Sequence, residues 1–314
     1  MKRLSLAKAA AFYLQSRRRL GFALETAGGL LGNLVRYSRQ VHHRGPLTTR
    51  LALQWAGLPA SGSPQRARRL ETVRQFALFW AVFDPRTQIP PAGLFGPAHR
   101  RQPVHLYTPA QISALLSAAE PGPLVGGRPL CCLRPLLGLL ACTGLRISEA
   151  LALRLSDWEP QEAVLTVRQS KFGQSRYVPL SPSAAGALKT YLEARRRAFP
   201  KSKSDALYLD AQGRNLSYGQ VNRAFGALRQ QLGWRQKPRP RLHDLRHTFA
   251  VNSLLDWYRT GQEELNAKIL SLAVYLGHRN IRNTYWYLSA VPELLALAST
   301  RWDQALQHPE RSQP

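Results

Sequence analysis

Two arginines, two histidines and a tyrosine in the C-terminal part of the chain are the residues best suited to chemistry on a phosphate: Arg146, His243, Arg246, His278 and Tyr287. A guanidinium stays charged, and its planar fork can hold two phosphate oxygens as negative charge builds up on them. A phenol can attack phosphorus, but its pKa of about 10 makes it a poor nucleophile without cationic neighbours and a base. The set therefore predicts a phosphate clamp with a tyrosine nucleophile.

The local settings of the two arginines fit this chemistry. Arg146 follows a helix-breaking glycine and begins a predicted helix over Arg146–Leu155, from which it can project into a cleft. His243 and Arg246 are three residues apart on a predicted helix over Leu242–Tyr258, so their side chains share a face and can reach one phosphate. Taken singly, either arginine is also typical of a protein surface, and the histidine is equally typical of a helix entry.

The remaining histidines and tyrosines also allow both a structural and a chemical interpretation. We expect His247 to point elsewhere on its helix and to have a structural role. His278 follows Gly277, which ends a predicted helix, and alone it is typical of a helix end. Tyr287 stands two residues after Tyr285, and successive side chains of a helix cannot all face the same way. Alone, Tyr287 is typical of a core, and Tyr285 stays open as a second candidate for the nucleophile.

A predicted β-hairpin carries a further candidate. Ala163–Arg168 and Arg176–Leu180 alternate between apolar and polar residues as strands do, and Gln169–Ser175 forms the turn between them. Lys171 lies near the tip of this hairpin. Such a lysine is usually solvated, but a mobile loop could insert it toward DNA, where it could give a proton to the leaving group.

The elements that must position these residues are mostly helical. Residues 1 to 82 show helical periodicity over Leu4–Leu14, Leu20–Val35 and Leu70–Val82, and proline, glycine and charge then mark a linker. We predict a mainly α fold: a helical domain over 1–96, a linker over 97–103, and a mostly helical domain over 104–314 with a small antiparallel β-sheet. A helix capped by Thr108 opens the second domain.

Other predicted helices complete this domain, and they cover Leu130–Cys142, Ala184–Arg197, Leu216–Leu232, Asn266–Leu276 and Asn280–Leu288. Val291–Leu306 can form an amphipathic helix. This helix could pack on its own domain or dock into a neighbouring protomer, and the sequence does not decide between the two.

The composition points to a polyanionic partner. The chain has 314 residues, 44 Lys and Arg against 18 Asp and Glu, and a formal net charge of +26 that is spread over both halves. No apolar run is long enough to span a bilayer, and no signal peptide is expected. The three cysteines, Cys131, Cys132 and Cys142, lie in an apolar stretch and are predicted to be buried free thiols. We therefore expect a cytoplasmic protein.

Taken in order, these segments resemble the tyrosine recombinase (phage integrase) family from about Tyr107 to Leu288. The matching segments are Thr143–Glu149, Lys171 followed by Arg176–Leu180, His243–Ala250, and Leu276–His278 with Tyr287 nine residues after the histidine. Each segment alone is weak, but their occurrence together in this order is specific. The stretch that contains Tyr287 also resembles recombinases of transposon-like mobile elements.

The resemblance implies a role for each residue of the phosphate pocket. Arg146 and Arg246 would hold the scissile phosphate, with His243 and His278 completing the pocket. Glu149, one helical turn after the first arginine, would orient that pocket without doing chemistry. The first domain, over 1–96, would be a core-binding (SAM-like) domain that clamps DNA together with the second.

The resemblance also implies the reaction and the partners. Lys171 would act as general acid to the 5′ oxygen, and Tyr287 would attack to form a 3′-phosphotyrosyl link that keeps the bond energy, so that no ATP, metal or other cofactor is needed. Double-stranded DNA is the expected partner, with a homo-oligomer (tetramer) on DNA and accessory recombinases as further expectations. The rival functions are type IB topoisomerase-like cleavage and rejoining, and a non-catalytic DNA-binding accessory subunit.

Overall fold

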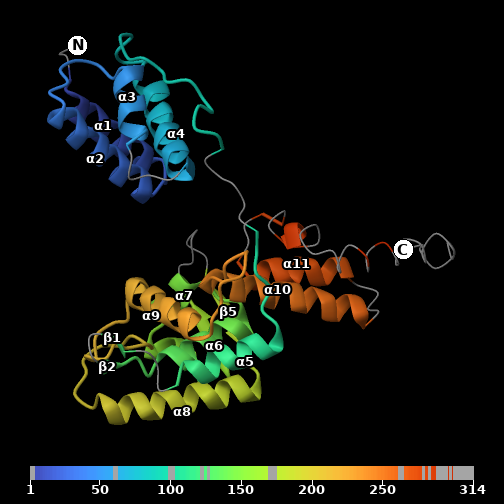
Figure 1. Ribbon diagram of the computed structural model, residues 1–314. Helices are drawn as coiled ribbons and strands as arrows, with labels where there is room; N and C mark the ends of the chain where they lie inside the picture. Colours follow the sequence, from blue (N-terminus) through green and yellow to red (C-terminus); the bar gives the residue numbers. More distant parts are fainter. Residues whose placement is uncertain are drawn as a thin grey trace. The chain divides into compact units, whose positions relative to one another are not determined.

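The computed structural model describes residues 4–58, 63–97, 103–120, 124–125, 128–168, 175–260, 265–277, 280–281, 284–287, 296 and 299. The chain divides into two compact units, the N-terminal unit Met1–Gln102 and the C-terminal unit Pro103–Pro314 (Figure 1). The described part is mainly helical and carries a small antiparallel sheet in the C-terminal unit, which confirms the predicted fold class. None of the described helices is both long and apolar enough to cross a membrane.

The N-terminal unit consists of helices around a shared apolar core: α1 (Leu6–Arg19), α2 (Glu25–Gln40), α3 (Thr49–Ala56) and α4 (Ser63–Trp80). The hydroxyls of Ser5 and Thr48 cap α1 and α3 by accepting backbone N–H groups, as small polar residues do at helix starts. Trp55 and Phe76 are fully buried between the helices.

The sequence located two of these helices imperfectly. The helix predicted over 20–35 begins at Glu25, because Gly21 and Leu24 both adopt left-handed backbone conformations, with φ of 86° and 48°. Helix α3 was not predicted, since it spans only 8 residues and gives a short periodic signal.

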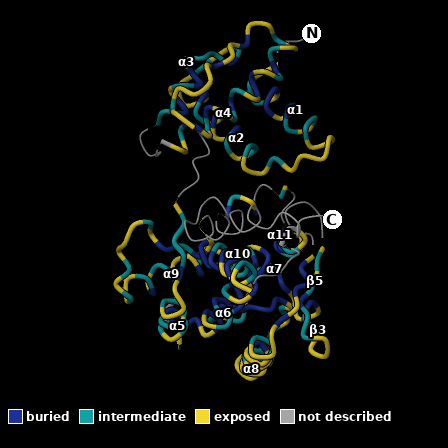
Figure 2. Tube along the Cα trace, turned by 90° about the vertical axis from the view of Figure 1, so that its right-hand side faces the viewer, coloured by how far each residue is buried: buried dark blue, intermediate teal, exposed yellow. Residues whose placement is uncertain are grey.

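The C-terminal unit is built on an apolar helix that other helices surround. Its helices are α5 (Pro109–Ala118), α6 (Leu133–Thr143), α7 (Ile147–Ala152), α8 (Pro182–Ala198), α9 (Tyr218–Gln231), α10 (Leu242–Arg259) and α11 (Leu265–Tyr275). Helix α6 buries most of its leucines, and Figure 2 shows buried residues along α6 and α10. The predicted capping box of Thr108 and Gln111 begins α5. The helix predicted over 146–155 is shorter in the structure: α7 spans Ile147–Ala152, and the extended backbone at Leu153 ends it.

Two antiparallel sheets complete the described part of this unit. The strands β3 (Trp158–Glu159), β4 (Val164–Val167) and β5 (Arg176–Pro179) pair in sequence order, and a short 3-10 helix (Leu155–Asp157) precedes them. Val167 pairs with Arg176, so the predicted hairpin is confirmed. A smaller sheet of β1 (Leu124–Val125) and β2 (Arg128–Pro129) was not predicted.

The cysteine prediction was wrong for two of the three thiols. Cys132 is buried, but Cys131 and Cys142 are exposed, and none of these three described cysteines forms a disulfide bond. Cys131 lies in a turn just before α6, and Cys142 lies on the face of α6 that points away from the core, so an apolar stretch did not guarantee burial.

Candidate active site

Arg246 is the most deeply buried cation of the candidate site. It lies in the second turn of α10 with 2% of its surface exposed. Its Nη1 donates to the carbonyl oxygen of Gly144 at 2.8 Å, and its Nη2 donates to that of Leu276 at 2.6 Å. Burial, followed by the nearby charge of Arg146, lowers the pKa of Arg246 to about 10. The guanidinium therefore stays charged at neutral pH and is held in one orientation.

Arg146 lies beside it at the start of α7. Its Nη1 donates to Glu149 Oε1 at 2.7 Å, and its Nη2 donates to the carbonyl oxygen of Gly277 at 3.1 Å. The backbone N–H of Arg146 also donates to Glu149 Oε2 at 3.0 Å, which closes the first turn of the helix. The side chain remains 22% exposed, so an incoming phosphate can reach it.

Glu149 joins this arginine to another that the sequence did not single out as a site residue. Arg176 on β5 donates Nη1 and Nη2 to the two oxygens of Glu149, at 3.2 and 2.8 Å, and its Nε donates to the carbonyl oxygen of Tyr275 at 2.7 Å. Burial alone would raise the pKa of Glu149, but hydrogen bonds from Arg176 and Arg146 outweigh it and lower that pKa to about 2. The carboxylate is therefore ionised and braces both cations.

Three arginines hold the end of α11. The carbonyl oxygens of Tyr275, Leu276 and Gly277 are consecutive, and each accepts a hydrogen bond from a different guanidinium, in the order Arg176, Arg246 and Arg146. Carbonyls at the C-terminal end of a helix lack partners within the helix and carry partial negative charge, so they suit cationic donors. This arrangement fixes the backbone directly before His278. His278 itself lies outside the described residues.

Two glycines allow the chain to pass through this crowded region. Gly144 ends α6 with a φ of 62°, and a Cβ there would lie 2.5 Å from a ring carbon of Phe249. Gly277 has a φ of 65°, and a Cβ there would lie 3.1 Å from Arg176 Nη1. A larger residue at Gly144 would clash and adopt a strained backbone, which explains the helix break before Arg146.

Helix α10 presents two histidines on the same face. Its start is fixed because Asp244 accepts the backbone N–H of Arg241 at 2.9 Å. The rings of His243 and His247 then meet edge to face, with centroids 4.6 Å apart. Part of His243 is exposed, yet partial burial of the ring and then the charge of Arg246 lower its pKa below the ordinary value. His243 is therefore neutral near pH 7.

The structure corrects the expectation that His247 points elsewhere. Its Nδ1 lies 3.1 Å from Oη of Tyr287, within hydrogen-bond distance. The spacing of His243 and His247, four residues on a helix, could have revealed their common face.

The two tyrosines differ in their surroundings. Tyr285 is 43% exposed, whereas Tyr287 is 3% exposed and packs against apolar residues of α10 and α11. The charge of Arg246 is also within electrostatic reach of Tyr287. The structure therefore brings Tyr287 together with Arg246 and with His247 of α10.

Lys171 lies outside the described residues, but its flanking residues are close to the site. Arg168 and Ser175, on either side of the segment 169–174, line a surface hollow of about 640 Å³ that Glu149 also lines. Arg168 is paired with the buried carboxylate of Asp157. The residues at both ends of the hairpin loop thus line the same hollow as the carboxylate that braces the arginines.

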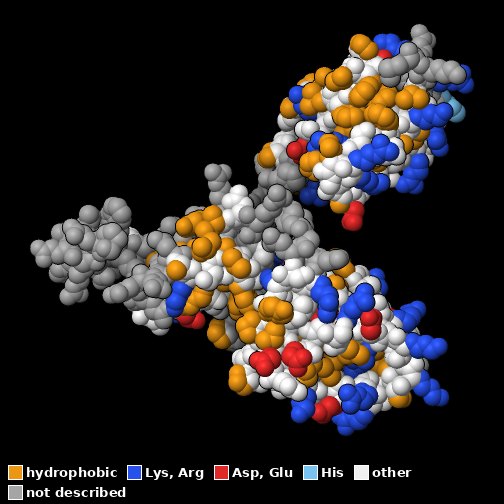
Figure 3. All heavy atoms as spheres, turned by 180° about the vertical axis from the view of Figure 1, so that it is seen from behind, with side chains coloured by type: hydrophobic (Ala, Val, Ile, Leu, Met, Phe, Trp, Pro, Cys, Tyr) orange, Lys and Arg blue, Asp and Glu red, His pale blue; other side chains and the backbone are white. Residues whose placement is uncertain are grey.

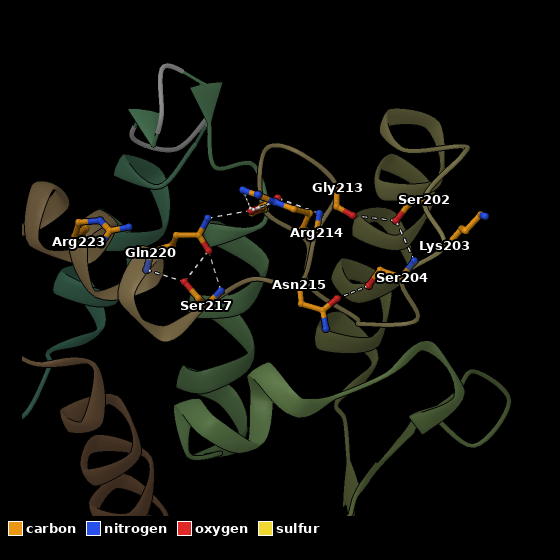
Figure 4. Close-up of a pocket in the computed structure, with 10 residues that line it drawn as sticks. Ser202, Lys203, Ser204, Gly213, Arg214, Asn215, Ser217, Gln220 and Arg223 are labelled. Atoms are coloured by element: carbon orange, nitrogen blue, oxygen red, sulfur yellow. Dashed lines mark hydrogen bonds and ion pairs between the residues drawn. The ribbon is translucent and has the colours of Figure 1, made fainter. Parts of the chain in front are cut away.

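Another hollow, of about 750 Å³, lies between the end of α8 and the start of α9 and contains none of the candidate residues (Figure 4). Gln220 bonds to Ser217, and Ser204 bonds to Asn215 across the loop. The hollow is lined mostly by polar side chains of the loop that connects α8 and α9. On the visible face, basic side chains gather toward one side of each unit, and acidic side chains lie near them in the C-terminal unit (Figure 3).

Comparison with known sequences identifies related proteins over most of the chain. Residues 106–293 match the Phage integrase family. The chain is 41% identical over 303 residues to the putative integrase/recombinase y4rB of Sinorhizobium fredii, covering 93% of this chain and 95% of that protein. It is 31% identical over 281 residues to the tyrosine recombinase XerD of Caulobacter vibrioides, covering 88% and 86% of the two chains.

Solved structures share the fold at low sequence identity. The Tn1549 transposon integrase in complex with transposon right end DNA aligns with a TM-score of 0.68 and 18% identity, covering 96% of this chain and 99% of that one. A lambda integrase dimer bound to a COC′ core site aligns with a TM-score of 0.61 and 18% identity, covering 91% and 77%. At such identities these alignments speak for the fold alone.

Proposed function

The chain belongs to the phage integrase family of tyrosine recombinases, and we propose that Tyr287 is the nucleophile with which it cuts DNA. It is a tyrosine-type site-specific recombinase, an enzyme that breaks and rejoins DNA strands. The observation that carries the proposal is the position of the phenol. Tyr287 lies on the histidine face of α10, within electrostatic reach of Arg246, while Tyr285 faces solvent.

The roles of the cations follow from how they are held. Arg146 and Arg246 would bind the non-bridging oxygens of the scissile phosphate, because both stay charged and both are oriented by backbone carbonyls at helix ends. Such preorganisation means that little reorganisation is needed as charge builds up in the transition state. His243 and His278 would complete the pocket as hydrogen-bond donors to the same phosphate.

The bonds that change can be stated for each step. Tyr287 Oη would attack phosphorus, forming a 3′-phosphotyrosyl link and breaking the bond to the 5′ oxygen. Lys171 would give this oxygen its proton, a role supported by the hollow that Arg168 and Ser175, on either side of its loop, line together with Glu149. A 5′ hydroxyl then attacks the link, releases the tyrosine and rejoins the DNA, so the bond energy is conserved.

The partners and the biological role are also inferred. We propose that residues 1–96 clamp double-stranded DNA together with residues 104–314 and that a homotetramer forms on DNA. The high positive charge supports DNA binding. A role in moving a mobile element is supported by the stretch around Tyr287, which resembles recombinases of transposon-like elements. Accessory recombinases are expected as further partners, and a non-catalytic accessory subunit is the alternative function. We also propose a cytoplasmic location, which fits a DNA substrate and three cysteines that form no disulfide bond.

A suicide substrate tests the proposal. A nick near the cleavage position lets a short fragment diffuse away after cleavage, so the covalent protein–DNA complex accumulates. We expect Tyr287→Phe to form no adduct and to bind DNA as the wild type does, and the matched control Tyr285→Phe to form the adduct normally. An adduct that persists in Tyr287→Phe and disappears in Tyr285→Phe would overturn the assignment.

The same chemistry without exchange would indicate a topoisomerase-like enzyme. Supercoiled plasmids that carry two target sites separate the two functions. We expect recombinant products, and relaxation of supercoils without any exchange between the sites would argue for the rival function.

A further inference from the structure

His247 contacts the atom that the proposed reaction uses. Its Nδ1 lies 3.1 Å from Oη of Tyr287, and the two rings meet edge to face with centroids 5.5 Å apart. A phenol carries its proton near neutral pH, because it titrates at about 10. A neutral imidazole with its hydrogen on Nε2 would accept that proton in a hydrogen bond at Nδ1.

The position of His247 is imposed by three neighbouring groups. It lies one residue after Arg246, whose side chain is buried and fixed by two carbonyls, so the helix backbone at this point is well anchored. On one side the ring of His243 meets it edge to face at 4.6 Å, and on another the ring of Trp286 does so at 5.5 Å. The imidazole therefore cannot turn away from the tyrosine without repacking.

We propose that His247 is a catalytic residue that holds the phenol of Tyr287 and takes its proton during cleavage. The inference rests on the proposed function, because it takes Tyr287 as the nucleophile. As Oη bonds to phosphorus, its O–H bond breaks and the proton moves to Nδ1 of His247, while Lys171 protonates the departing 5′ oxygen. In rejoining, the 5′ hydroxyl gives its proton back to Lys171, and the proton on His247 returns to the phenol.

This assignment separates two histidines that lie next to each other. His243 is exposed and its ring meets that of His247 edge to face, so we assign it the contact with an incoming phosphate. The ring of His247 contacts the rings of both His243 and Tyr287. The proposed base, His247, and the proposed hydrogen-bond donor to the phosphate, His243, thus lie one helical turn apart on the same face of α10.

Two substitutions separate holding from proton transfer. His247→Phe keeps the ring shape and removes both nitrogens. His247→Asn places an amide near the position of Nδ1, so it can still bond to the phenol but cannot take its proton. In single-turnover cleavage of the suicide substrate by the full chain, we expect both variants to form adduct about 100- to 10,000-fold more slowly at wild-type DNA affinity. His105→Phe, at a histidine of the same unit that bonds to Gln111, is the matched control.

A sulfur substrate identifies which side of the reaction is affected. When the bridging 5′ oxygen is replaced by sulfur, the leaving thiolate needs no proton. This substrate should restore cleavage in Lys171→Ala but not in either His247 variant, because their defect lies at the nucleophile. Thermal melting followed by circular dichroism verifies folding, and the asparagine variant carries the test where the phenylalanine variant does not fold.

Three results would overturn the inference: wild-type cleavage by His247→Phe, wild-type cleavage by His247→Asn, or restoration of either variant by the sulfur substrate. Tyr287→Phe distinguishes this failure from failure of the proposed function. If that variant forms no adduct while the His247 variants cleave normally, only the role of His247 is wrong. If Tyr287→Phe still forms the adduct, the nucleophile itself is wrong.

Discussion

Replacing Glu149 by glutamine should remove a large, pH-dependent part of the stability of the C-terminal unit. The carboxylate is 6% exposed and accepts hydrogen bonds from Arg146 and Arg176, and its pKa falls from 4.5 to about 2. This shift corresponds to about 3 kcal/mol of stability at pH 7. Breaking a buried ion pair by removing one partner costs about 3 to 5 kcal/mol, which agrees with that figure.

The pH dependence has a definite sign. The pKa of Glu149 is lower in the folded state, so the unfolded chain binds more protons as the pH falls from 4.5 toward 2. The stabilisation is therefore complete well above pH 4.5 and is lost toward pH 2. We expect the difference in unfolding free energy between wild type and Glu149→Gln to shrink by about 2 kcal/mol between pH 7 and pH 3.

Urea denaturation of the full chain, followed by circular dichroism at a series of pH values, measures this difference. Glu193→Gln, at an exposed carboxylate of α8, is the matched control and should change stability little at any pH. The transition of the N-terminal unit serves as an internal reference, because both substitutions lie in the other unit. A difference between wild type and Glu149→Gln that stays constant from pH 7 to pH 3 would refute the reasoning.

Three further predictions concern the surroundings of the candidate site and DNA binding by the whole chain. Gly144→Ala should lower the melting temperature, because the left-handed backbone costs about 1 to 2 kcal/mol and the new Cβ would meet the ring of Phe249. The control Gly186→Ala in α8, where a Cβ meets nothing within 4 Å, should leave the melting temperature unchanged. Equal melting temperatures of the two variants would contradict this prediction. Arg176→Lys should slow adduct formation at unchanged DNA affinity, because an ammonium cannot span both oxygens of Glu149 and the carbonyl of Tyr275. Arg154→Lys, at an exposed ion pair, is the control. Equal rates for the two variants would count against the role of Arg176 in holding Glu149. DNA binding should weaken by about a thousandfold or more between 50 and 200 mM salt if the chain neutralises six or more phosphates, and gel-shift titrations that show flat binding would argue against a DNA clamp.

The sequence predicted the residue types of the site better than their connections. Types and order indicated Arg146, Arg246 and Tyr287, because a phosphate pocket demands cations and a nucleophile. It did not indicate that Arg176 braces Glu149, because a single arginine in a strand gives no signal of the long-range contact it makes. Hydrogen bonds to the carbonyls at the end of α11 likewise depend on tertiary packing.

Local rules succeeded where neighbouring residues determine structure. The capping box at Thr108 and the hairpin of β4 and β5 follow from short-range pattern, and both are present. The side on which His247 lies was also within reach of a local rule, since its spacing from His243 puts the two on one helical face. No local rule could separate Tyr285 from Tyr287, because the difference depends on which side chain packs against α10 and α11.

Mass spectrometry of the trapped covalent complex tests the central claim most directly. After the suicide reaction, protease and nuclease digestion leaves a peptide that carries a short nucleotide remnant. We predict that the remnant is attached to the oxygen of Tyr287 through a 3′ phosphate. A remnant on Tyr285 or on any other residue, or one attached through a 5′ phosphate, would contradict the account.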